Sequence, residues 1–396
     1  MTGTNSSLFS HDDPIFANKE LLEINHLPND DQIVGRDQEI ESLATALNPA
    51  LFGQSPSNVL LYGKTGTGKS LCAKHVSRQL VNEAHSEGTT IGRAYVDCAQ
   101  DTTETQAVQS IASELNTDST GTSIPDKGIS TSTYYKRLWR ILDHEYDVAI
   151  IILDEIDKLE NDEILMQLSR AGEAGKLDHC KLGIIGISNK INYGDRMNER
   201  VKSSLGEREF VFPAYDALQL RKIMHARENA FKENVLEEDV IPRAAAEAAQ
   251  EHGDARKAID ILRYAGEIAQ TKGDSEVREE YVVQAHDRAE INRFQELIRG
   301  AAPHSKRVLR ALAGLTLQED DEAFRTSRVY DAYEEICVSD GVGALSARRV
   351  RDLLQEHAFL DVIEQADRSG GSADGKYTEH RLLEDPEVVR DVLAEP

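Results

Sequence analysis

Residues 58–70 read Asn58-Val-Leu-Leu-Tyr-Gly-Lys-Thr-Gly-Thr-Gly-Lys-Ser70. The apolar start predicts a short buried strand, and the rest matches the phosphate-loop pattern G-x-x-x-x-G-K-[ST] before a helix. In such a loop, backbone N–H groups surround phosphates and the next helix directs its positive end at them. We therefore predict that Lys69 contacts the β and γ phosphates and that Ser70 binds Mg²⁺. The other predicted nucleotide contacts here are Gly63, Lys64, Thr65, Gly66, Thr67, Gly68 and Leu71.

The runs on either side of this loop predict an α/β protein. Strand candidates are short, apolar on both parities and rich in β-branched residues, as in parallel strands buried on both faces. They are Asn58–Tyr62, Gly92–Asp97, Val148–Asp154 and Lys181–Ser188. After Pro213 the pattern changes, and residues 216 to about 292 are almost entirely helical in pattern, with breaks at Gly253-Asp254 and Gly273-Asp274.

Two carboxylates follow the most apolar strand. Asp154 is placed to bind the magnesium shell, and Glu155 to orient and deprotonate an attacking water. The alternative is an acidic N-cap for the next helix. The following strand ends in Asn189, whose amide could hydrogen-bond the γ-phosphate or the water, although asparagine at a strand end is also common turn chemistry.

The charge of the chain is unusual. Its 396 residues, enough for two or three domains, carry 70 acidic and 45 basic side chains and a net charge of −25. This excludes a generic basic nucleic-acid binder. An acidic, lysine-poor surface indicates either an acidic interaction protein or a cytosol so salty that repulsion is screened. The acidic residues are spread over most of the predicted helices, which favours the second explanation, a halophilic host.

The cysteines and the apolar runs bear on the compartment. Four separated cysteines without a CxxC pair predict neither a disulfide framework nor a zinc site. The longest purely apolar run, Val148–Leu153, is far short of the roughly 20 residues of a membrane span. Residues 1–13 are polar and lack a signal-like core. We expect a soluble, cytoplasmic protein.

The phosphate loop, the Asp-Glu strand, Asn189 and a helical segment with Gly253-Asp-Ala-Arg256 together resemble an AAA+ ATPase. The resemblance implies ATP/ADP and Mg²⁺ as cofactors, Asn189 as sensor 1 and Arg256 as sensor 2. Arg256 begins a helix whose predicted apolar face is Ile259, Leu262 and Ala265/Gly266, so that its side chain can reach the nucleotide; the alternative is a solvated surface arginine. Ile33-Val34-Gly-Arg36 resembles the adenine-contacting segment, and Tyr215 is a further expected contact.

Two further segments resemble the archaeal replication initiators, the family named for the origin recognition complex and cell division control proteins. Glu199-Arg200-Val-Lys-Ser-Ser-Leu205, followed by Phe210-Val-Phe-Pro213, resembles their arginine-finger box. It implies that Arg200, or alternatively Arg208, reaches a neighbour's ATP. Residues 101–130 occupy the place of the family's helical insertion but contain few bases, so we expect DNA contact there through backbone N–H groups rather than side chains.

The C-terminal part predicts a winged helix. Helical patterns at 305–316, 326–338 and 346–357 precede a possible hairpin of Phe359–Val362 with Tyr377–Leu382. The third helix has Ser346 as N-cap and a buried face of Val350, Leu353, Leu354 and His357. Its outward residues are Arg348, Arg349, Asp352 and Gln355, the layout of a recognition helix. The predicted DNA contacts are Arg348, Arg349, Arg351, Lys376 and Arg381. From Pro303 onward acidic residues outnumber basic ones, so a protein partner is the alternative.

The expected domains are a lead-in (1–30), an AAA+ P-loop core with a parallel sheet (31–215), an all-helical lid (216–298) and a winged helix (299–396). The resemblance implies an ATP-dependent replication initiator that binds double-stranded origin DNA, alone or with other initiator copies, within the nucleoid. It would recruit the minichromosome maintenance helicase, with slow ATP hydrolysis as the switch. Alternatives are an AAA+ transcription or signalling regulator and a clamp-loader or remodelling subunit.

Overall fold

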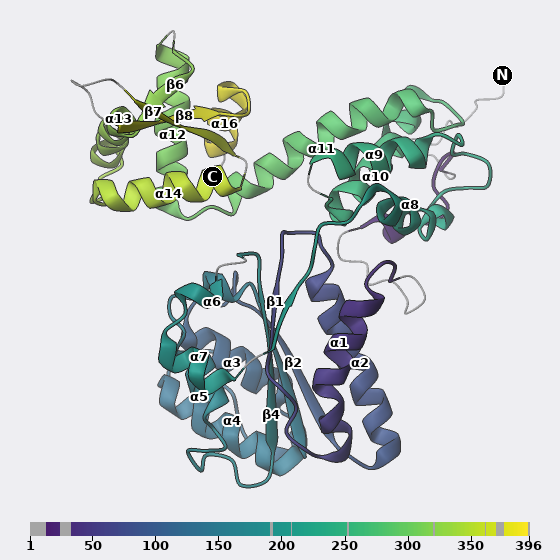
Figure 1. Ribbon diagram of the computed structural model, residues 1–396, viewed down its shortest axis with the longest axis vertical. Helices are drawn as coiled ribbons and strands as arrows, with labels where there is room; N and C mark the ends of the chain where they lie inside the picture. The colour runs from purple at the N-terminus through teal and green to yellow at the C-terminus, as the bar shows by residue number, and fades with distance from the viewer. Residues whose placement is uncertain are drawn as a thin grey trace, which may run out of the picture. The chain divides into compact units, whose positions relative to one another are not determined.

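The computed structural model describes residues 13–23, 33–190, 193–206, 208–251, 253–319, 321–360, 362–369 and 376–394. They form two compact units, one ending at His286 and one beginning at Asp287 (Figure 1). This division falls inside the helix α11 (Glu279–Arg299). The first unit contains the α/β core and the lid, and the second is the winged helix.

A five-stranded parallel sheet forms the centre of the core. Its order is β2 (Ile91–Asp97), β3 (Val148–Asp154), β4 (Lys181–Ser188), β1 (Val59–Tyr62) and β5 (Arg208–Val211). The four predicted strands are confirmed to within one residue. The edge strand β5 was not predicted, because its residues are mostly exposed and lack the apolar run that marked the others.

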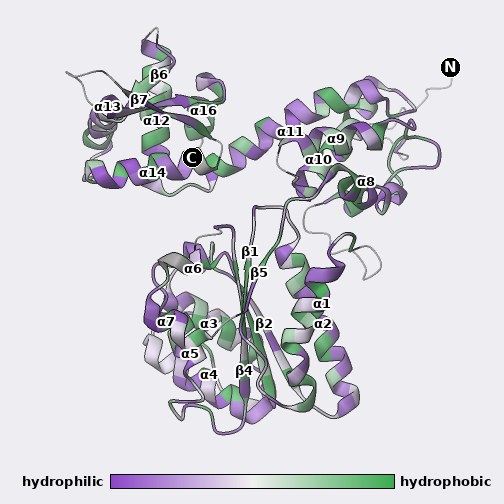
Figure 2. Cartoon of the chain, viewed as in Figure 1, coloured by the Kyte–Doolittle hydropathy of each residue, from purple (hydrophilic) through white to green (hydrophobic). Residues whose placement is uncertain are grey.

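Helices cover both faces of this sheet (Figure 1). One face carries α1 (Asp37–Leu47), the 3-10 turn η3 (Asn48–Phe52) and α2 (Lys69–Glu87). The other carries α3 (Glu104–Leu115), α4 (Thr131–Glu145), α5 (Glu163–Ser169), α6 (Tyr193–Arg196) and α7 (Glu199–Leu205). Successive residues of β3 point to opposite faces, so Ile150 packs toward α2 and Ile151 toward α3. Figure 2 shows the resulting apolar centre.

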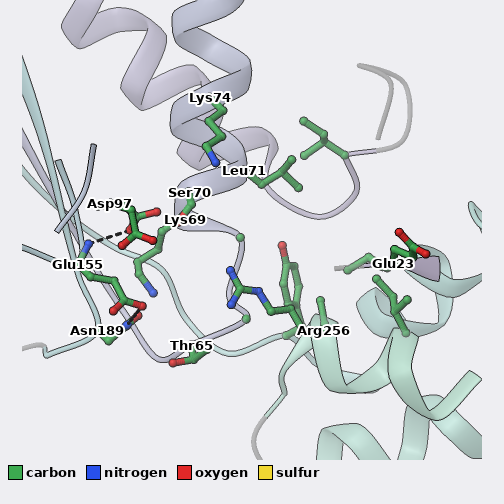
Figure 3. Close-up of a pocket in the computed structure, with 18 of the residues that line it drawn as sticks. Glu23, Thr65, Lys69, Ser70, Leu71, Lys74, Asp97, Glu155, Asn189 and Arg256 are labelled. Carbon is green, nitrogen blue, oxygen red and sulfur yellow. Dashed lines mark hydrogen bonds between the residues drawn. The ribbon is translucent and has the colours of Figure 1, made fainter. Parts of the chain in front are cut away.

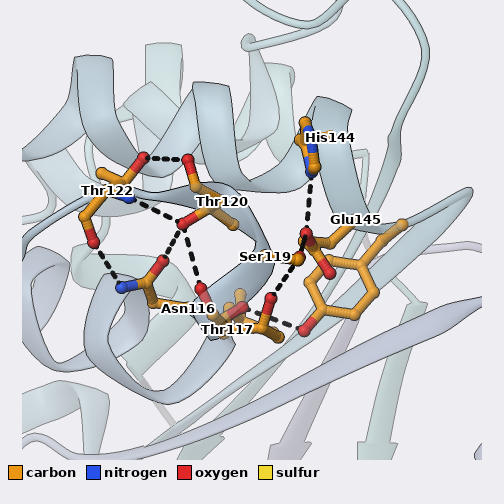
Figure 4. A network of polar contacts seen from close by, with 9 residues as sticks. Asn116, Thr117, Ser119, Thr120, Thr122, His144 and Glu145 are labelled. Carbon is orange, nitrogen blue, oxygen red and sulfur yellow. Dashed lines mark hydrogen bonds and ion pairs between the residues drawn. The ribbon is translucent and has the colours of Figure 1, made fainter.

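The segment predicted as an insertion is tied to the core. Helix α3 begins with a capping box between Thr103 and Gln106 and buries Val108 and Ile111. The turn η4 (Asp118–Thr120) follows, held by the polar network of Figure 4. In it Asn116 Nδ2 donates to the Thr122 carbonyl at 2.7 Å, and Ser119 donates to Glu145 of α4. Residues 101–130 contain a single base, Lys127, as noted from the sequence.

The lid follows the sheet and includes the N-terminal lead-in. Its helices are α8 (Ala217–His225), η6 (Glu228–Ala230), α9 (Val240–Glu251) and α10 (Ala255–Lys272), followed by α11. The breaks before α10 and α11 lie at the predicted glycines, Gly253 and Gly273, whereas the interruption between α8 and α9 was not predicted. In the lead-in, which contains η1 (Lys19–Leu22), Phe16 stacks against Phe231 with ring centroids 5.1 Å apart. The Ala17 N–H donates to the Ala230 carbonyl, and Lys19 pairs with Glu267 at 2.9 Å.

The second unit combines helices with a small three-stranded sheet. Its elements are α12 (Pro303–Gln318), β6 (Ala323–Arg325), α13 (Thr326–Ser339), α14 (Ala347–Phe359), β7 (Ile363–Ser369), β8 (Lys376–Leu382) and α16 (Pro386–Ala394). The antiparallel strand order is β6-β8-β7. The three predicted helices are confirmed. Ser346 caps α14 by accepting from the Arg349 N–H, and Val350 and Leu354 are fully buried.

The predicted hairpin was wrong in its first strand. Helix α14 continues to Phe359, and the strand that pairs with β8 begins only at Ile363. That strand reads Ile363-Glu-Gln-Ala-Asp-Arg-Ser369, so it has little of the apolar character that placed the prediction at 359–362. The short strand β6 was also missed. The Gly-rich residues 370–375 lie outside the described residues.

Two other observations concern membrane-spanning helices and the cysteines. No helix in the described ranges has both the length and the apolar composition required to cross a membrane. All four cysteines are buried free thiols.

Candidate active site

A cavity of about 520 Å³ lies between the phosphate loop, the carboxyl ends of three strands and the lid (Figure 3). It collects most of the predicted nucleotide-site residues. Those that line it are Val34, Thr65, Gly66, Gly68, Lys69, Ser70, Leu71, Asp154, Glu155, Asn189, Tyr215 and Arg256. Gly63, Lys64 and Thr67 belong to the same loop but do not line the cavity.

The phosphate loop holds its lysine in place. Lys69 Nζ donates to the carbonyls of Gly63 at 2.8 Å and Lys64 at 2.7 Å. Burial lowers the pKa of Lys69 to about 8, although the nearby Asp154 opposes the shift. Gly66 and Gly68 have φ of +73° and +89°, which side chains with a Cβ rarely adopt. These features fit a phosphate, because an ammonium group and a glycine cradle face the cavity together.

The two carboxylates at the end of β3, Asp154 and Glu155, have different surroundings. Asp154 accepts from the Tyr95 hydroxyl at 2.6 Å and from the Glu155 N–H at 3.0 Å. Glu155 has φ of 53°, an uncommon conformation for a residue with a side chain. Burial raises its pKa, which improves it as a proton acceptor. Asn189 Nδ2 donates to Glu155 Oε1 at 3.4 Å, so the predicted asparagine does lie beside the predicted base.

Ser70 and Asp154 offer a hydroxyl and a carboxylate to the cavity, the oxygen ligands that Mg²⁺ prefers. The donor set therefore fits a nucleotide-bound magnesium ion.

Residues of β2 and α2 that the motifs did not indicate also line this end of the cavity. Tyr95 orients Asp154, and Lys74 Nζ lies 3.6 Å from the centre of the Tyr95 ring. Asp97 is in register with Asp154. The sequence could have indicated Tyr95 and Asp97 only by their place at the end of a strand, because neighbouring parallel strands end at the same edge of the sheet.

The lid brings Arg256 to the loop. Asp254 caps α10 by accepting from the Arg256 N–H at 2.7 Å and from the Lys257 N–H at 3.3 Å. The Ala255 N–H donates to the Gly66 carbonyl at 3.2 Å, and a Cβ on Gly66 would lie only 1.7 Å from Asp254 Oδ1. The first residues of α10 are therefore in direct contact with the phosphate loop.

One part of the α10 prediction was wrong. Ile259 is only half-buried and lines the cavity, one turn after Arg256. The buried face is instead formed by Ala258, Ile261, Leu262 and Ala265. Neighbouring helix residues differ in direction by about 100°. A prediction of the buried face that is shifted by one residue therefore assigns the wrong side chain to the cavity.

A buried arginine, Arg36, joins the loop to the start of the lid. Its Nε donates to the Thr67 carbonyl at 2.8 Å, and its Nη2 donates to the Pro213 carbonyl at 2.5 Å. The guanidinium lies 3.8 Å from the centre of the Tyr215 ring. Burial raises the pKa of Tyr215 to about 12. The segment containing Arg36 was predicted to contact adenine, whereas Arg36 itself packs against the phosphate loop.

The candidate arginine fingers lie elsewhere. Arg200 in the first turn of α7 and Arg208 at the start of β5 are both exposed, and neither lines the cavity. Their side chains are therefore accessible to another molecule rather than to the nucleotide site of their own chain.

The predicted DNA contacts divide into two groups. Arg348, Arg349 and Arg351 are exposed on α14, and within the described part of the chain neither Arg348 nor Arg351 has an ion-pair partner. On β8, Lys376 is exposed, but Arg381 already pairs with Glu364 at 2.7 Å and with Glu322 at 3.7 Å. The helix thus presents free cations, whereas the wing is partly neutralised.

The sheet, the loop, the carboxylates and the lid define an AAA+ ATPase with a winged helix. Residues 53–188 match the family model of the AAA domain, 221–287 that of the Cdc6 AAA+ ATPase-type lid domain, and 296–392 that of the CDC6 C-terminal winged helix domain. The chain belongs to the ORC1-type DNA replication proteins of the ORC1/Cdc6 family, as the following relatives show.

An ORC1-type DNA replication protein of Halobacterium salinarum is 56% identical over 98% of this chain and 97% of its own. One of Haloarcula marismortui is 50% identical over 95% of this chain and 90% of its own. Among solved structures, the Aeropyrum pernix ORC1 protein in complex with DNA has a TM-score of 0.78 and 35% identity, covering 97% of each chain.

Proposed function

We propose that this protein is an ATP-dependent initiator of DNA replication that binds double-stranded origin DNA and helps to recruit the minichromosome maintenance helicase. The observation that carries the proposal is the combination, in one ORC1-type chain, of the cavity at the phosphate loop and a winged helix with free arginines. The similar ORC1 protein solved with DNA supports DNA as the partner. On DNA the protein would act in the nucleoid, with other initiator copies where sites adjoin.

The residues of the cavity divide the work of ATP hydrolysis. Lys69 would exchange its two loop carbonyls for phosphate oxygens, and Ser70 and Asp154 would hold Mg²⁺. The bound nucleotide and metal supply the scissile phosphoanhydride and the Lewis acid. Glu155, held by Asn189, would take the proton of the attacking water at its carboxylate, while Arg256 would contact the phosphates from the lid.

We infer that hydrolysis is slow and ends an ATP-bound state on DNA. Arg200, with Arg208 as the alternative, would complete the nucleotide site of a neighbouring copy, because it is exposed and does not line the cavity of its own chain. Lys69→Ala should abolish ATP binding, whereas Glu155→Gln should bind ATP without cleaving it. Full hydrolysis by the Glu155 variant would contradict this assignment.

On DNA, the exposed arginines of α14 would read the major groove. In concentrated salt, counterion release contributes little, so affinity must come from base contacts, shape and water release. This agrees with a net acidic winged helix that keeps only a few free cations. Lys376 and Arg381 would add phosphate or minor-groove contacts from the wing.

The test is to measure which fragments of the host genome the full-length protein retains with ATP in molar potassium chloride. The wild type is compared with Arg348→Ala/Arg349→Ala and with Arg390→Ala, which removes an exposed arginine from α16. Enrichment of a few intergenic repeats, lost only in the α14 variant, is expected. Retention of many promoters would instead support a transcription regulator, and retention of nothing would support a protein partner.

A further inference from the structure

The lid supplies a second arginine to the cavity, outside the motifs identified in the sequence. Arg227 directly follows α8, lines the same cavity as Arg256 and is only 8% exposed. Its Nη1 donates to the Ile223 carbonyl at 3.5 Å, the outer limit of a hydrogen bond. Within the described ranges its side chain has no other hydrogen-bond acceptor and no carboxylate partner.

Such an arginine is unusual. A guanidinium carries five N–H donors, and buried charges in proteins are nearly always paired because desolvation is costly. Burial lowers the pKa of Arg227. A side chain kept in this state at the wall of a cavity is therefore expected to find its acceptors on a ligand.

The place of Arg227 identifies the part of the ligand. The phosphate end of the cavity contains Lys69 and Glu155, and the charge of Arg256 acts on Lys69 there. Arg227 instead has Ile223 and Tyr215 as its neighbours. The cavity also has an apolar lining, formed by Ile33, Val34, Leu71, Tyr215, Ile223 and Ile259, and Arg227 neighbours two of these residues.

The one carboxylate of the lead-in at the cavity, Glu23, lies across Arg256 from Glu155 (Figure 3). It forms no ion pair with Arg227 in the described part of the chain. A flat, apolar group with ring-nitrogen acceptors fits this end, which describes a nucleobase.

We propose that Arg227 binds the base of the nucleotide, donating a free N–H group to a ring nitrogen of adenine. The inference rests on the proposed function of the cavity as an ATP site. Adenine offers N1, N3 and N7 as separate ring-nitrogen acceptors, and its exocyclic amino group is a donor. One guanidinium N–H can therefore be accepted by one ring nitrogen.

The test compares ligands with and without a base. Calorimetry on the full-length protein gives Kd for ATP, ADP and tripolyphosphate with the wild type, with Arg227→Met and with Arg221→Met. Methionine keeps the length of the side chain but has no donor, and Arg221 is an exposed arginine of α8 that serves as the control. Hydrogen bonds to charged groups predict that Arg227→Met weakens ATP and ADP about 10- to 100-fold. Tripolyphosphate should be unaffected, and Arg221→Met should match the wild type.

The other outcomes overturn the proposal. Equal weakening of tripolyphosphate would place Arg227 at the phosphates, and unchanged ATP binding would leave it a structural residue. If Arg227→Met does not fold, Arg227→Lys is tested with ATP analogues in which N1, N3 or N7 is replaced by carbon. One analogue should bind the wild type about tenfold more weakly and lose this penalty in Arg227→Lys; equal penalties in both proteins overturn the proposal. A wild type that binds no ATP would instead contradict the proposed function.

Discussion

Replacing Gly66 by alanine tests the contact between the phosphate loop and the lid. The new Cβ would lie 1.7 Å from Asp254 Oδ1 and 2.1 Å from its Cγ, far inside the 3.0 Å that real Cβ contacts keep. Asp254 is held by the N–H groups of Arg256 and Lys257, which it caps. The methyl group therefore forces either the loop or the start of α10 to move.

The expected magnitudes follow from these contacts. Left-handed backbone at φ of +73° costs an alanine about 1–2 kcal/mol, and loss of the Asp254 cap costs about 1 kcal/mol more. Urea unfolding in molar salt should thus show a loss of about 2–3 kcal/mol. Displacing α10 also withdraws Arg256, so calorimetry should show ATP binding weakened about 10- to 100-fold.

Two further variants separate the backbone strain of an alanine at position 66 from the collision of its methyl group with Asp254. Gly88 has a similar φ of +78°, but nothing lies within 4 Å of the methyl group that an alanine would add there, so Gly88→Ala should lose only the strain and keep its ATP affinity. Adding Asp254→Ala to Gly66→Ala removes the colliding carboxylate, so the double variant should lose less than the sum of the single losses. Wild-type ATP affinity in Gly66→Ala, or strict additivity in the double variant, would refute the reasoning.

Glu155→Gln should reduce single-turnover ATP hydrolysis about 10²- to 10⁴-fold without changing ATP affinity, since a general base contributes that much; a smaller loss would assign the proton to another acceptor. Because the pKa of Lys69 is lowered to about 8 and phosphate favours its charged form, affinity should be retained below this pH and lost above it. The ATP Kd should rise up to about tenfold per pH unit beyond it, and a constant Kd in calorimetry would contradict the lysine's role. Glu364→Gln should remove the closer of the two carboxylate partners of Arg381, leaving only Glu322 at 3.7 Å, and strengthen DNA binding up to about fivefold. Fluorescence anisotropy against Glu387→Gln measures this, and equal affinities would show that Arg381 does not touch DNA.

The sequence predicted those elements in which burial and local pattern agree. Strand β3 was placed to the residue because all seven of its side chains are buried. Helix α14 was placed with its cap, because Ser346 and the buried stripe point to the same start. Strand β7 was misplaced because its alternating polar residues carry no apolar run, and β5 was missed because it lies at an edge.

The same distinction explains the site. Lys69, Asp154 and Glu155 were predictable because each belongs to a short contiguous sequence motif that indicates its chemistry. Arg36 and Arg227 were not, since each acquires its role from contacts that only the fold creates: Arg36 meets carbonyls at positions 67 and 213. The local sequence gives Arg227 no mark that separates it from a solvated arginine, and it placed Arg36 in a base-contacting segment without indicating these carbonyl partners.

The pairing of the lead-in with the lid has a consequence for synthesis of the chain. Phe16 leaves the ribosome early, yet its partner Phe231 follows about 215 residues later. At roughly 5–20 residues per second this is a wait of about 10–40 s. Throughout that time an aromatic side chain destined for burial lacks its native aromatic partner, while the sheet between the two is already able to form. The nascent protein therefore passes through a stage in which its ATPase core is complete but its lid is not.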